Sequence, residues 1–171
     1  MNQLKISAAE AMAVAAHGEQ KYGDQPYGKH LAHVVEVLLR FGIRDEDMVA
    51  AAWLHDSVED TEMSLLQIEA TFGKRTKDLV HRVTNEEGKN RKERHIKTYP
   101  KIAESDDAIT LKLADRIANT ESSIDDKDKL KMYQKEYKSF RNYLYKQGMH
   151  DAMWRHLDFL TGEIDDKAPS K

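Results

Sequence analysis

Residues 48–60 read "MVAAAWLHDSVED", an apolar run that ends in a cluster of ionisable side chains. Because residues four apart share one face of a helix, a continued helix aligns His55 with Glu59 and Asp56 with Asp60. The cluster contains no lysine or arginine that would offset its three carboxylates. Burial of such groups is costly unless they become neutral or meet a cation. We therefore expect a divalent metal ion here; a solvated edge with surface ion pairs is the alternative.

The rest of the chain predicts an all-α protein. Long windows carry apolar residues at three- and four-residue spacing, and most of the 3 prolines and 8 glycines lie between these windows. A length of 171 residues suits one domain. We expect one compact helical bundle of about eight to ten helices over residues 1–163. In this prediction residues 127–163 form packing helices, and residues 164–171 form a flexible tail.

Local signals predict where several elements begin and end. Ser7 is the expected N-cap of the first helix. Residues 18–29 read as a loop, and the polar residues 85–90 as a mobile loop. Pro100 is expected to disturb the helix that contains it, because proline lacks a backbone donor.

Charge and composition exclude some classes of function. The net charge is −3 with both signs interspersed, which argues against a nucleic-acid binder. No segment is apolar enough to span a membrane, so a soluble cytoplasmic protein is the default expectation. With no cysteine, metal ligands must come from histidine, aspartate and glutamate.

Two further positions are candidate ligands. In "LKLADRIANT", residues 111–120, Asp115 interrupts an apolar helix and Asn119 follows one turn later. An ion pair between Asp115 and the adjacent Arg116 is an equal alternative. His30, after "DQPYGK", opens another helix, and a lone histidine there is more often structural.

Four stretches in order resemble one family over about residues 8–125: "AHGEQKYGDQPYGKHLAHVV", "AAWLHDSVEDTEMSLLQIEATFG", "VTNEEGKNRKER" and "LKLADRIANTESS". Together they resemble the HD-domain metal phosphohydrolases, in particular the hydrolase domain of the RelA/SpoT homologues and the small metazoan SpoT homologue type. The resemblance implies an HD-domain helical bundle. It also implies one divalent cation, Mn²⁺ in first place, held by His30, His55, Asp56 and Asp115. His33, one turn beyond His30, is the fallback ligand.

The same resemblance implies roles for other residues. Glu59 and Asp60 match the catalytic acid pair, which would orient or deprotonate water and pass a proton to the leaving oxygen. The implied substrate-binding residues are Lys21, Asn119, Ser122, Lys89, Arg91 and Arg94. Here the loop before Pro26 is about one residue shorter than in the family, and Lys21 is its only basic side chain. For the three residues between 89 and 94, a solvated helix start is the equal alternative.

The function implied is hydrolysis of guanosine tetra- or pentaphosphate, (p)ppGpp, to GDP or GTP and pyrophosphate. Two alternatives stay open. One is an HD phosphohydrolase that acts on another nucleotide, such as a nucleoside monophosphate, an adenine alarmone or the 2′-phosphate of NADPH. The other is a nucleotide sensor without turnover. The expected partner is a small nucleotide, with no nucleic acid and no membrane, and a homodimer through the C-terminal aromatic residues is a minor alternative to their packing in the core.

Overall fold

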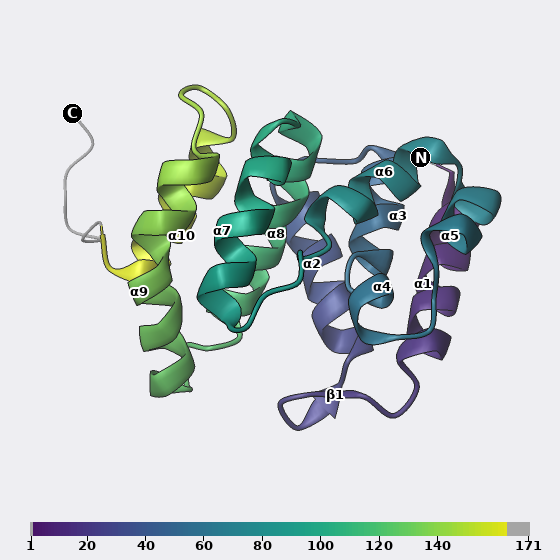
Figure 1. Cartoon of the computed structure of the whole chain (residues 1–171), viewed down its shortest axis with the longest axis horizontal. Coiled ribbons are helices and arrows are strands. Elements are labelled where there is room, and N and C mark those ends of the chain that lie inside the picture. Colours follow the sequence, from purple (N-terminus) through teal and green to yellow (C-terminus); the bar gives the residue numbers. More distant parts are fainter. Residues whose placement is uncertain (1, 164–171) are drawn as a thin grey trace.

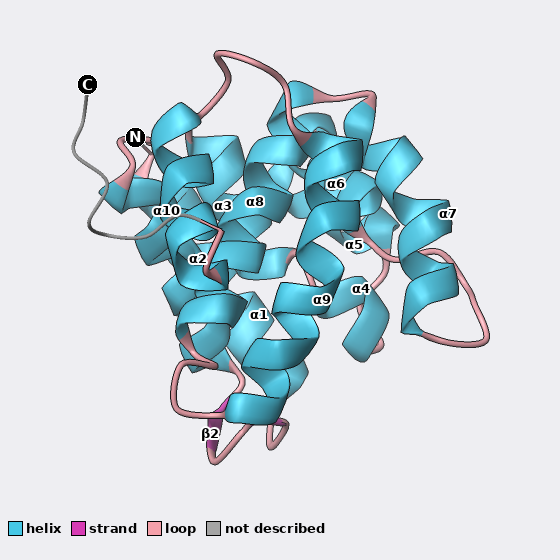
Figure 2. Ribbon diagram, turned by 90° about the vertical axis from the view of Figure 1, so that its left-hand side faces the viewer, coloured by secondary structure: helices cyan, strands magenta, loops and turns pink. Residues whose placement is uncertain are grey.

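A computed structural model describes residues 2–163, which form ten helices and one two-stranded hairpin (Figures 1 and 2). The expected all-α bundle is therefore confirmed. The helices are α1 (Gln3–His17), α2 (Gly28–Arg40), α3 (Glu46–Leu54), α4 (Ser57–Asp60), α5 (Leu65–Phe72), α6 (Lys74–Val83), α7 (Arg91–Ala103), α8 (Asp106–Glu121), α9 (Lys127–Leu144) and α10 (Asp151–Thr161). No helix within residues 2–163 is long and apolar enough to cross a lipid bilayer.

Helix α8 forms the centre of the bundle. Helices α2, α3, α6, α7, α9 and α10 all pack against it. It begins at the N-cap Ser105, whose side chain accepts a hydrogen bond from the backbone of Ala108. Twelve of its sixteen residues are buried, including the charged Lys112, Asp115 and Arg116. Buried charges need partners, so the elements around α8 must supply them.

Helix α1 begins earlier than the sequence predicted. Asn2, not Ser7, is the N-cap, and its side chain accepts a hydrogen bond from the backbone of Lys5. The capping side chain nearest the chain start therefore sets where this helix begins.

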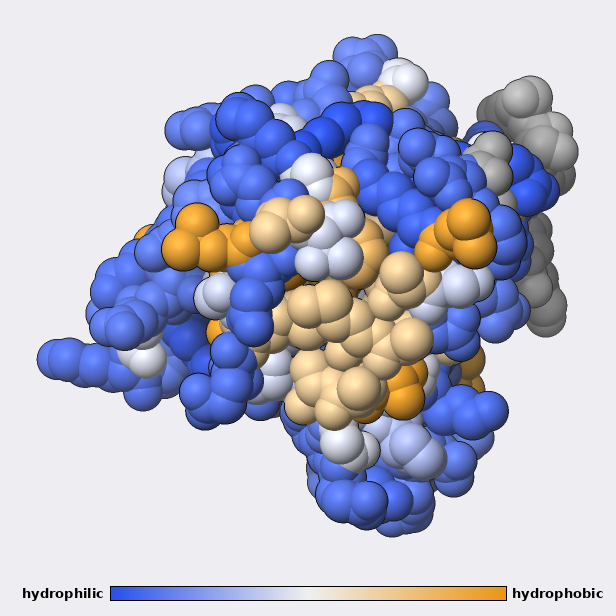
Figure 3. Space-filling model, turned by 90° about the vertical axis from the view of Figure 1, so that its right-hand side faces the viewer, coloured by the Kyte–Doolittle hydropathy of each residue, from blue (hydrophilic) through white to orange (hydrophobic). Residues whose placement is uncertain are grey.

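Helix α1 packs against α3 and carries alanines on both its buried and exposed sides. Figure 3 shows the resulting pale apolar surface at the end of the molecule that carries α1 and α5, where Leu4 and Leu66 are exposed.

The opening stretch does not form one continuous helix. Helix α3 ends at Leu54, and α4 is a separate single turn. The His55 imidazole Nδ1 lies 2.8 Å from the Ala52 carbonyl oxygen, which an uninterrupted helix would pair with the backbone N–H of Asp56. The Asp56 carbonyl still accepts from the backbone N–H of Asp60, at 3.0 Å. The predicted alignment of Asp56 with Asp60 is thus kept, whereas the helix breaks at His55.

The loop after α1 contains a small hairpin that the sequence did not predict. Strands β1 (Lys21–Tyr22) and β2 (Gln25–Pro26) pair antiparallel, with Tyr22 opposite Gln25. The turn between them requires Gly23 at φ 59°, a conformation that glycine adopts without strain. Figure 1 shows this hairpin projecting at the lower edge of the bundle, beyond α2 and α4. Elsewhere, α7 runs through Pro100 to Ala103, so the expected disturbance does not end that helix.

The C-terminal helices α9 and α10 pack against α8 and against each other. Their buried side chains include Tyr133, Tyr137, Phe140, Leu144, Trp154 and Leu157. Tyr143 on the same helix is 40% exposed, and a homodimer through this region stays a prediction. The predicted flexible tail, residues 164–171, lies outside the described residues.

Glu121, at the end of α8, joins three helices. Its carboxylate lies 2.7 Å from His33 Nε2 on α2 and 2.6 Å from His156 Nε2 on α10, and it accepts from Arg40 at 2.5 Å. Burial raises the pKa of Glu121, but these three partners outweigh burial and hold its pKa at about 2. The folded state therefore favours the ionised carboxylate.

Glu121→Gln tests this junction. A depressed folded-state pKa contributes stability above the unfolded pKa, and that contribution is lost as pH falls through the folded value. We expect the variant to lower the free energy of unfolding by about 1–2 kcal/mol at pH 7 in urea titrations. The difference from wild type should shrink as pH falls from about 4.5 towards 2. Glu10→Gln, at an exposed position, is the control; a pH-independent difference would contradict the assignment.

Candidate functional site

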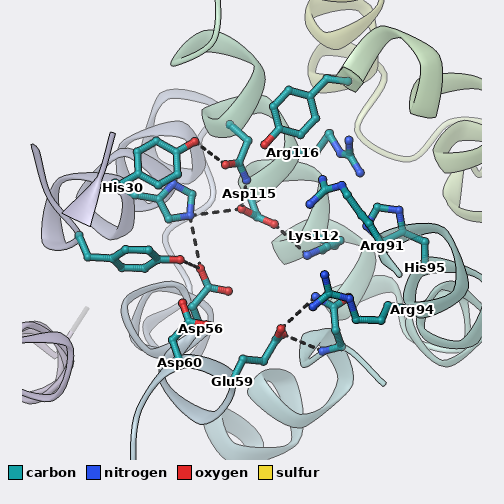
Figure 4. A pocket seen from close by; sticks show the side chains of 15 residues that line it. His30, Asp56, Glu59, Asp60, Arg91, Arg94, His95, Lys112, Asp115 and Arg116 are labelled. Carbon is teal, nitrogen blue, oxygen red and sulfur yellow. Dashed lines mark hydrogen bonds and ion pairs between the residues drawn. The ribbon is translucent and has the colours of Figure 1, made fainter. Parts of the chain in front are cut away.

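A cavity of about 270 Å³ opens between the hairpin and helices α2, α4, α7, α8 and α9. Its lining divides into acidic and basic sides: in Figure 4, Asp56 and Asp60 lie on one side, Arg91 and Arg94 lie on the other, and Glu59 lies between them. The lining residues are Tyr22, Tyr27, His30, Asp56, Glu59, Asp60, Asn85, Arg91, Arg94, His95, Lys112, Asp115, Arg116, Asn119 and Tyr133.

The four predicted metal ligands come together at the acidic side of the cavity. His30 Nε2 lies 3.6 Å from Asp56 Oδ2 and 3.4 Å from Asp115 Oδ1. His55 Nε2 lies 3.1 Å and 3.6 Å from the same two oxygens. Ligand atoms of His30, His55 and Asp56 all lie within 4.8 Å of one another. Three separate segments therefore place two imidazoles and two carboxylates around one point.

Hydrogen bonding fixes the His55 ring in a metal-binding tautomer. Only a protonated Nδ1 can donate to the Ala52 carbonyl, so in the neutral ring the lone pair is on Nε2, the nitrogen that faces the carboxylates. Nε2 is buried and has no hydrogen-bond partner among the described residues. A divalent cation would use this lone pair, and a mixed nitrogen and oxygen donor set suits such an ion. The residues present therefore fit the divalent metal expected from the sequence.

The electrostatics of the cluster point the same way. Burial alone lowers the pKa of His55 and raises those of Asp56 and Asp115. The mutual attraction between imidazoles and carboxylates reverses both effects, so the pKa of His55 is raised and those of the two aspartates are lowered. The protonated imidazole and the ionised carboxylates therefore stabilise each other across the cluster, and the carboxylates stay ionised.

Further side chains hold the ligands in place. The Tyr27 hydroxyl donates to Asp56 Oδ2 at 2.6 Å. Lys112 Nζ donates to Asp115 Oδ2 at 2.9 Å, and Asn119 Nδ2 donates to Asp115 Oδ1 at 2.5 Å. Burial lowers the pKa of Lys112, but the Asp115 carboxylate outweighs it and raises that pKa. Both carboxylates are therefore restrained, and one buried lysine offsets part of their charge.

The predicted acid pair lines the same cavity. Glu59 accepts two hydrogen bonds from Asn85, from its backbone N at 2.7 Å and its side-chain Nδ2 at 3.0 Å. Asp60 accepts from Gln20 Nε2 at 2.9 Å. Both acids are exposed, so each can exchange protons with solvent. The sequence did not single out Asn85 or Gln20, because neither amide carries a signal before its carboxylate partner is known.

The basic side of the cavity separates the three predicted phosphate contacts. Arg91 and Arg94 line the cavity, whereas Lys89 is exposed and lies outside the lining. Arg91 is paired with Glu136, at 2.6 Å. The Arg94 guanidinium has no hydrogen-bond or ion-pair partner among the described residues. It is therefore the cation most available to a ligand.

Two further residues, Arg116 and His95, belong to the basic side of the cavity. Arg116 shares Glu136 with Arg91, at 2.8 Å, and its guanidinium lies over the Tyr133 ring. His95 is buried beside these arginines, and desolvation lowers its pKa to about 4. A neutral imidazole is thus kept next to the cationic groups. The sequence signal was only that His95 lies one helical turn beyond Arg91.

The remaining predicted substrate contacts lie in different places. Asn119 lines the cavity, but Lys21 is exposed and outside the lining, and the adjacent Tyr22 takes the inner position. The Tyr22 ring stacks on His30 with 4.6 Å between ring centroids, and its hydroxyl donates to Asn119 at 2.6 Å. Ser122 lies outside the lining, with its hydroxyl 3.2 Å from His33. The fallback ligand His33 is accordingly engaged away from the cluster.

Asp56→Asn tests the metal site. The variant removes a carboxylate charge from a cluster whose histidine lone pair has no other partner, so we expect Mn²⁺ affinity to fall by at least about 10-fold. Isothermal titration of the metal-free protein with Mn²⁺ measures this directly. Glu59→Gln, on the cavity wall, should keep wild-type metal affinity, and Asp24→Asn on the hairpin turn is the surface control. Unchanged affinity in Asp56→Asn would refute the ligand assignment.

Comparison with known proteins agrees with this geometry. A guanosine-3′,5′-bis(diphosphate) 3′-pyrophosphohydrolase of Aquifex aeolicus is 35% identical over 123 residues, which cover 69% of this chain and 18% of that protein. The human guanosine-3′,5′-bis(diphosphate) 3′-pyrophosphohydrolase MESH1 is 34% identical over 120 residues, 67% of each chain. The chain thus spans less than a fifth of the long bacterial relative and two thirds of the human one.

A solved structure described as a metazoan orthologue of SpoT that hydrolyses ppGpp superposes with a TM-score of 0.82, at 26% identity, over 93% of this chain and 94% of that one. The family model of the HD domain matches residues 7–142. That span contains the four clustered ligand side chains and both acids, so the site lies within the matched region. On these grounds the chain belongs to the HD domain family.

Proposed function

We propose that this chain hydrolyses the 3′-pyrophosphate of guanosine tetra- and pentaphosphate, releasing GDP or GTP and pyrophosphate, with Mn²⁺ as its cation. The observation that carries the proposal is the cluster of His30, His55, Asp56 and Asp115. It lies at a cavity that is also lined by the acid pair and by an arginine wall, which consists of Arg91, Arg94 and Arg116. The names of the Aquifex aeolicus and human relatives support the substrate. We also propose that it acts in the cytoplasm.

His30, His55, Asp56 and Asp115 would hold the cation. When bound, a divalent cation lowers the pKa of water and offsets phosphate charge. Glu59, which accepts two hydrogen bonds from Asn85, would take a proton from the attacking water. Asp60, the next residue of the same helical turn, would deliver a proton to the ribose oxygen that leaves. In this proposal the two acids have different roles, one as base and one as acid.

The arginine wall supplies the positive charge that a polyphosphate needs. Arg94 has no acidic partner among the described residues, whereas Arg91 and Arg116 share the single carboxylate of Glu136. The wall therefore keeps a net positive charge in a protein whose overall charge is −3. Guanidinium groups bind phosphate oxygens in pairs, which gives both affinity and orientation.

A second candidate is hydrolysis of a different nucleotide by the same site. Lys21, the one basic side chain expected to contact guanine, lies outside the cavity lining, and Tyr22 takes the inner position. A phenol ring presents an aromatic face to any base. The presence of Tyr22 in the cavity in place of Lys21 therefore weakens the argument for guanine in particular. An adenine alarmone or NADPH is compatible with the same metal cluster and acid pair.

A nucleotide panel separates these candidates. Purified protein with Mn²⁺ is incubated with (p)ppGpp, an adenine alarmone, NADPH and nucleoside monophosphates, and pyrophosphate and orthophosphate are quantified separately. We expect pyrophosphate from the guanosine alarmones, with the highest kcat/KM of the panel. Orthophosphate from another nucleotide as the main product would favour the second candidate. Failure to turn over any of them would leave a sensor as the remaining alternative.

Arg94→Gln and Lys89→Gln form a matched pair for the arginine wall. Loss of a charge-assisted hydrogen bond costs about 1.5–3 kcal/mol, so Arg94→Gln should lower kcat/KM by about 10- to 100-fold. Lys89→Gln removes the same charge five residues away, outside the cavity lining, and should change kcat/KM by less than about threefold. Steady-state kinetics at fixed ionic strength measure both. Equal losses in the two variants would mean that the overall positive charge of this surface, and not a direct contact of Arg94 with the substrate, affects kcat/KM.

A further inference from the structure

The two acids of the pair are held by different segments of the chain. Glu59 is fixed by Asn85, in the segment after α6, whereas Asp60 accepts its hydrogen bond from Gln20, in the loop after α1. Within residues 2–163, Gln20 is the one side chain that donates to the Asp60 carboxylate. Since Asp60 is exposed, its rotamer depends on this contact.

The orientation of the Gln20 amide fixes a tautomer at His17. Gln20 Nε2 donates to Asp60, so the amide oxygen Oε1 points the other way, 2.8 Å from His17 Nδ1. An amide oxygen only accepts hydrogen bonds, so His17 must carry its proton on Nδ1. The opposite nitrogen, Nε2, is buried and has no partner among the described residues. The His17 ring therefore forms its hydrogen bond through Nδ1 alone.

His17 is itself held against the metal cluster. Its ring stacks on Tyr27, with 4.4 Å between centroids and 14° between planes, and the Tyr27 hydroxyl donates to the candidate ligand Asp56. The backbone restrains Gln20 on both sides, because its N–H donates to the His17 carbonyl at 2.9 Å and its carbonyl accepts from Tyr27 at 3.0 Å. Side-chain contacts therefore link Asp56 to Asp60 through Tyr27, His17 and Gln20.

We propose that Gln20, oriented by His17, is a positioning residue that holds the Asp60 carboxyl group at the leaving oxygen of the substrate. This rests on the proposed function. Water adds to phosphorus and gives one proton to Glu59, the phosphorus–oxygen bond to the ribose breaks, and Asp60 gives one proton to the ribose oxygen. Exchange with solvent restores both acids. These contacts begin at Asp56, and the backbone of Asp60 also bonds to the Asp56 carbonyl. The Asp60 carboxyl group is therefore held relative to the metal site both by the side-chain contacts and by the helical turn.

The inference predicts a defect that depends on the leaving group. Gln20→Ala should lower kcat on (p)ppGpp by about 10- to 100-fold, within the range of general acid catalysis, and change KM by less than about threefold. An analogue with sulfur in place of the bridging 3′ oxygen expels a thiolate, which needs no proton. On that analogue the variant should lose less than about threefold in kcat. Gln25→Ala, an exposed glutamine of the same hairpin, is the matched control.

Two further measurements do not depend on the loaded enzyme. Mn²⁺ affinity of Gln20→Ala should equal wild type, because Gln20 contacts no candidate ligand. Nitrogen-15 NMR of the metal-free protein should show the His17 proton on Nδ1 in wild type and a shift towards the Nε2 tautomer in Gln20→Ala. His17→Phe keeps a ring on Tyr27 while it removes the donor, and should reproduce the leaving-group pattern in weaker form.

The outcomes separate this inference from the function on which it rests. If wild type releases pyrophosphate but Gln20→Ala loses kcat equally on the oxygen and sulfur substrates, or not at all, the positioning role is wrong and the proposed function stands. A wild-type His17 proton on Nε2 would also overturn it. Absence of any wild-type turnover would remove the proposed function and the positioning role together.

Discussion

The structure depends on one electrostatic constraint: Asp115 is buried on the central helix α8, and its charge must be compensated there. Lys112 and Asn119, one turn to either side, each donate to one of its oxygens, while His30 and His55 face it across the cavity. Because these groups come from different helices, the cluster forms only when the helices pack in one arrangement. Removing one member of a buried charged set costs more than the set contributes when it is complete. The proposed metal binding and the folding of the chain would therefore be coupled through the same residues.

The short loop before α2 carries much of the site's order. Tyr27 reaches Asp56, Gln20 reaches Asp60, and Tyr22 reaches Asn119, so three side chains within eight residues touch the ligand, acid and pocket positions. The hairpin supplies the alternation that makes this possible, because successive strand residues point to opposite faces. Lys21 consequently faces outward where Tyr22 faces inward. The alternation along β1 therefore decides which of the two side chains enters the cavity.

The sequence was informative where chemistry and periodicity coincide. The three carboxylates of residues 56–60 follow an apolar run without a lysine or arginine among them, so their cost was visible before any fold was known. Asp115 alone was ambiguous because of the adjacent Arg116, and family resemblance joined it to the histidines. Side-chain direction in a two-residue strand was not visible, and Lys21 was therefore preferred to Tyr22. The start of α1 at Asn2 and the break at His55 were also missed. Both depend on one side chain that takes a backbone hydrogen bond, and helix propensity carries no information on that competition.

The Asn119 amide shows how the acidic and aromatic parts of the site constrain each other. Its Nδ2 must face the Asp115 carboxylate, so its oxygen faces Tyr22, and the phenol must therefore donate its proton. Burial raises the pKa of Tyr22, and nearby carboxylates raise it further, so the proton stays on the phenol. Asn119 keeps one N–H and one lone pair for a ligand, and both directions are already set by its two partners. A ribose that binds Asn119 must accordingly approach beside the Tyr22 ring, and this fixes the side from which the sugar enters the cavity relative to His30, on which that ring is stacked.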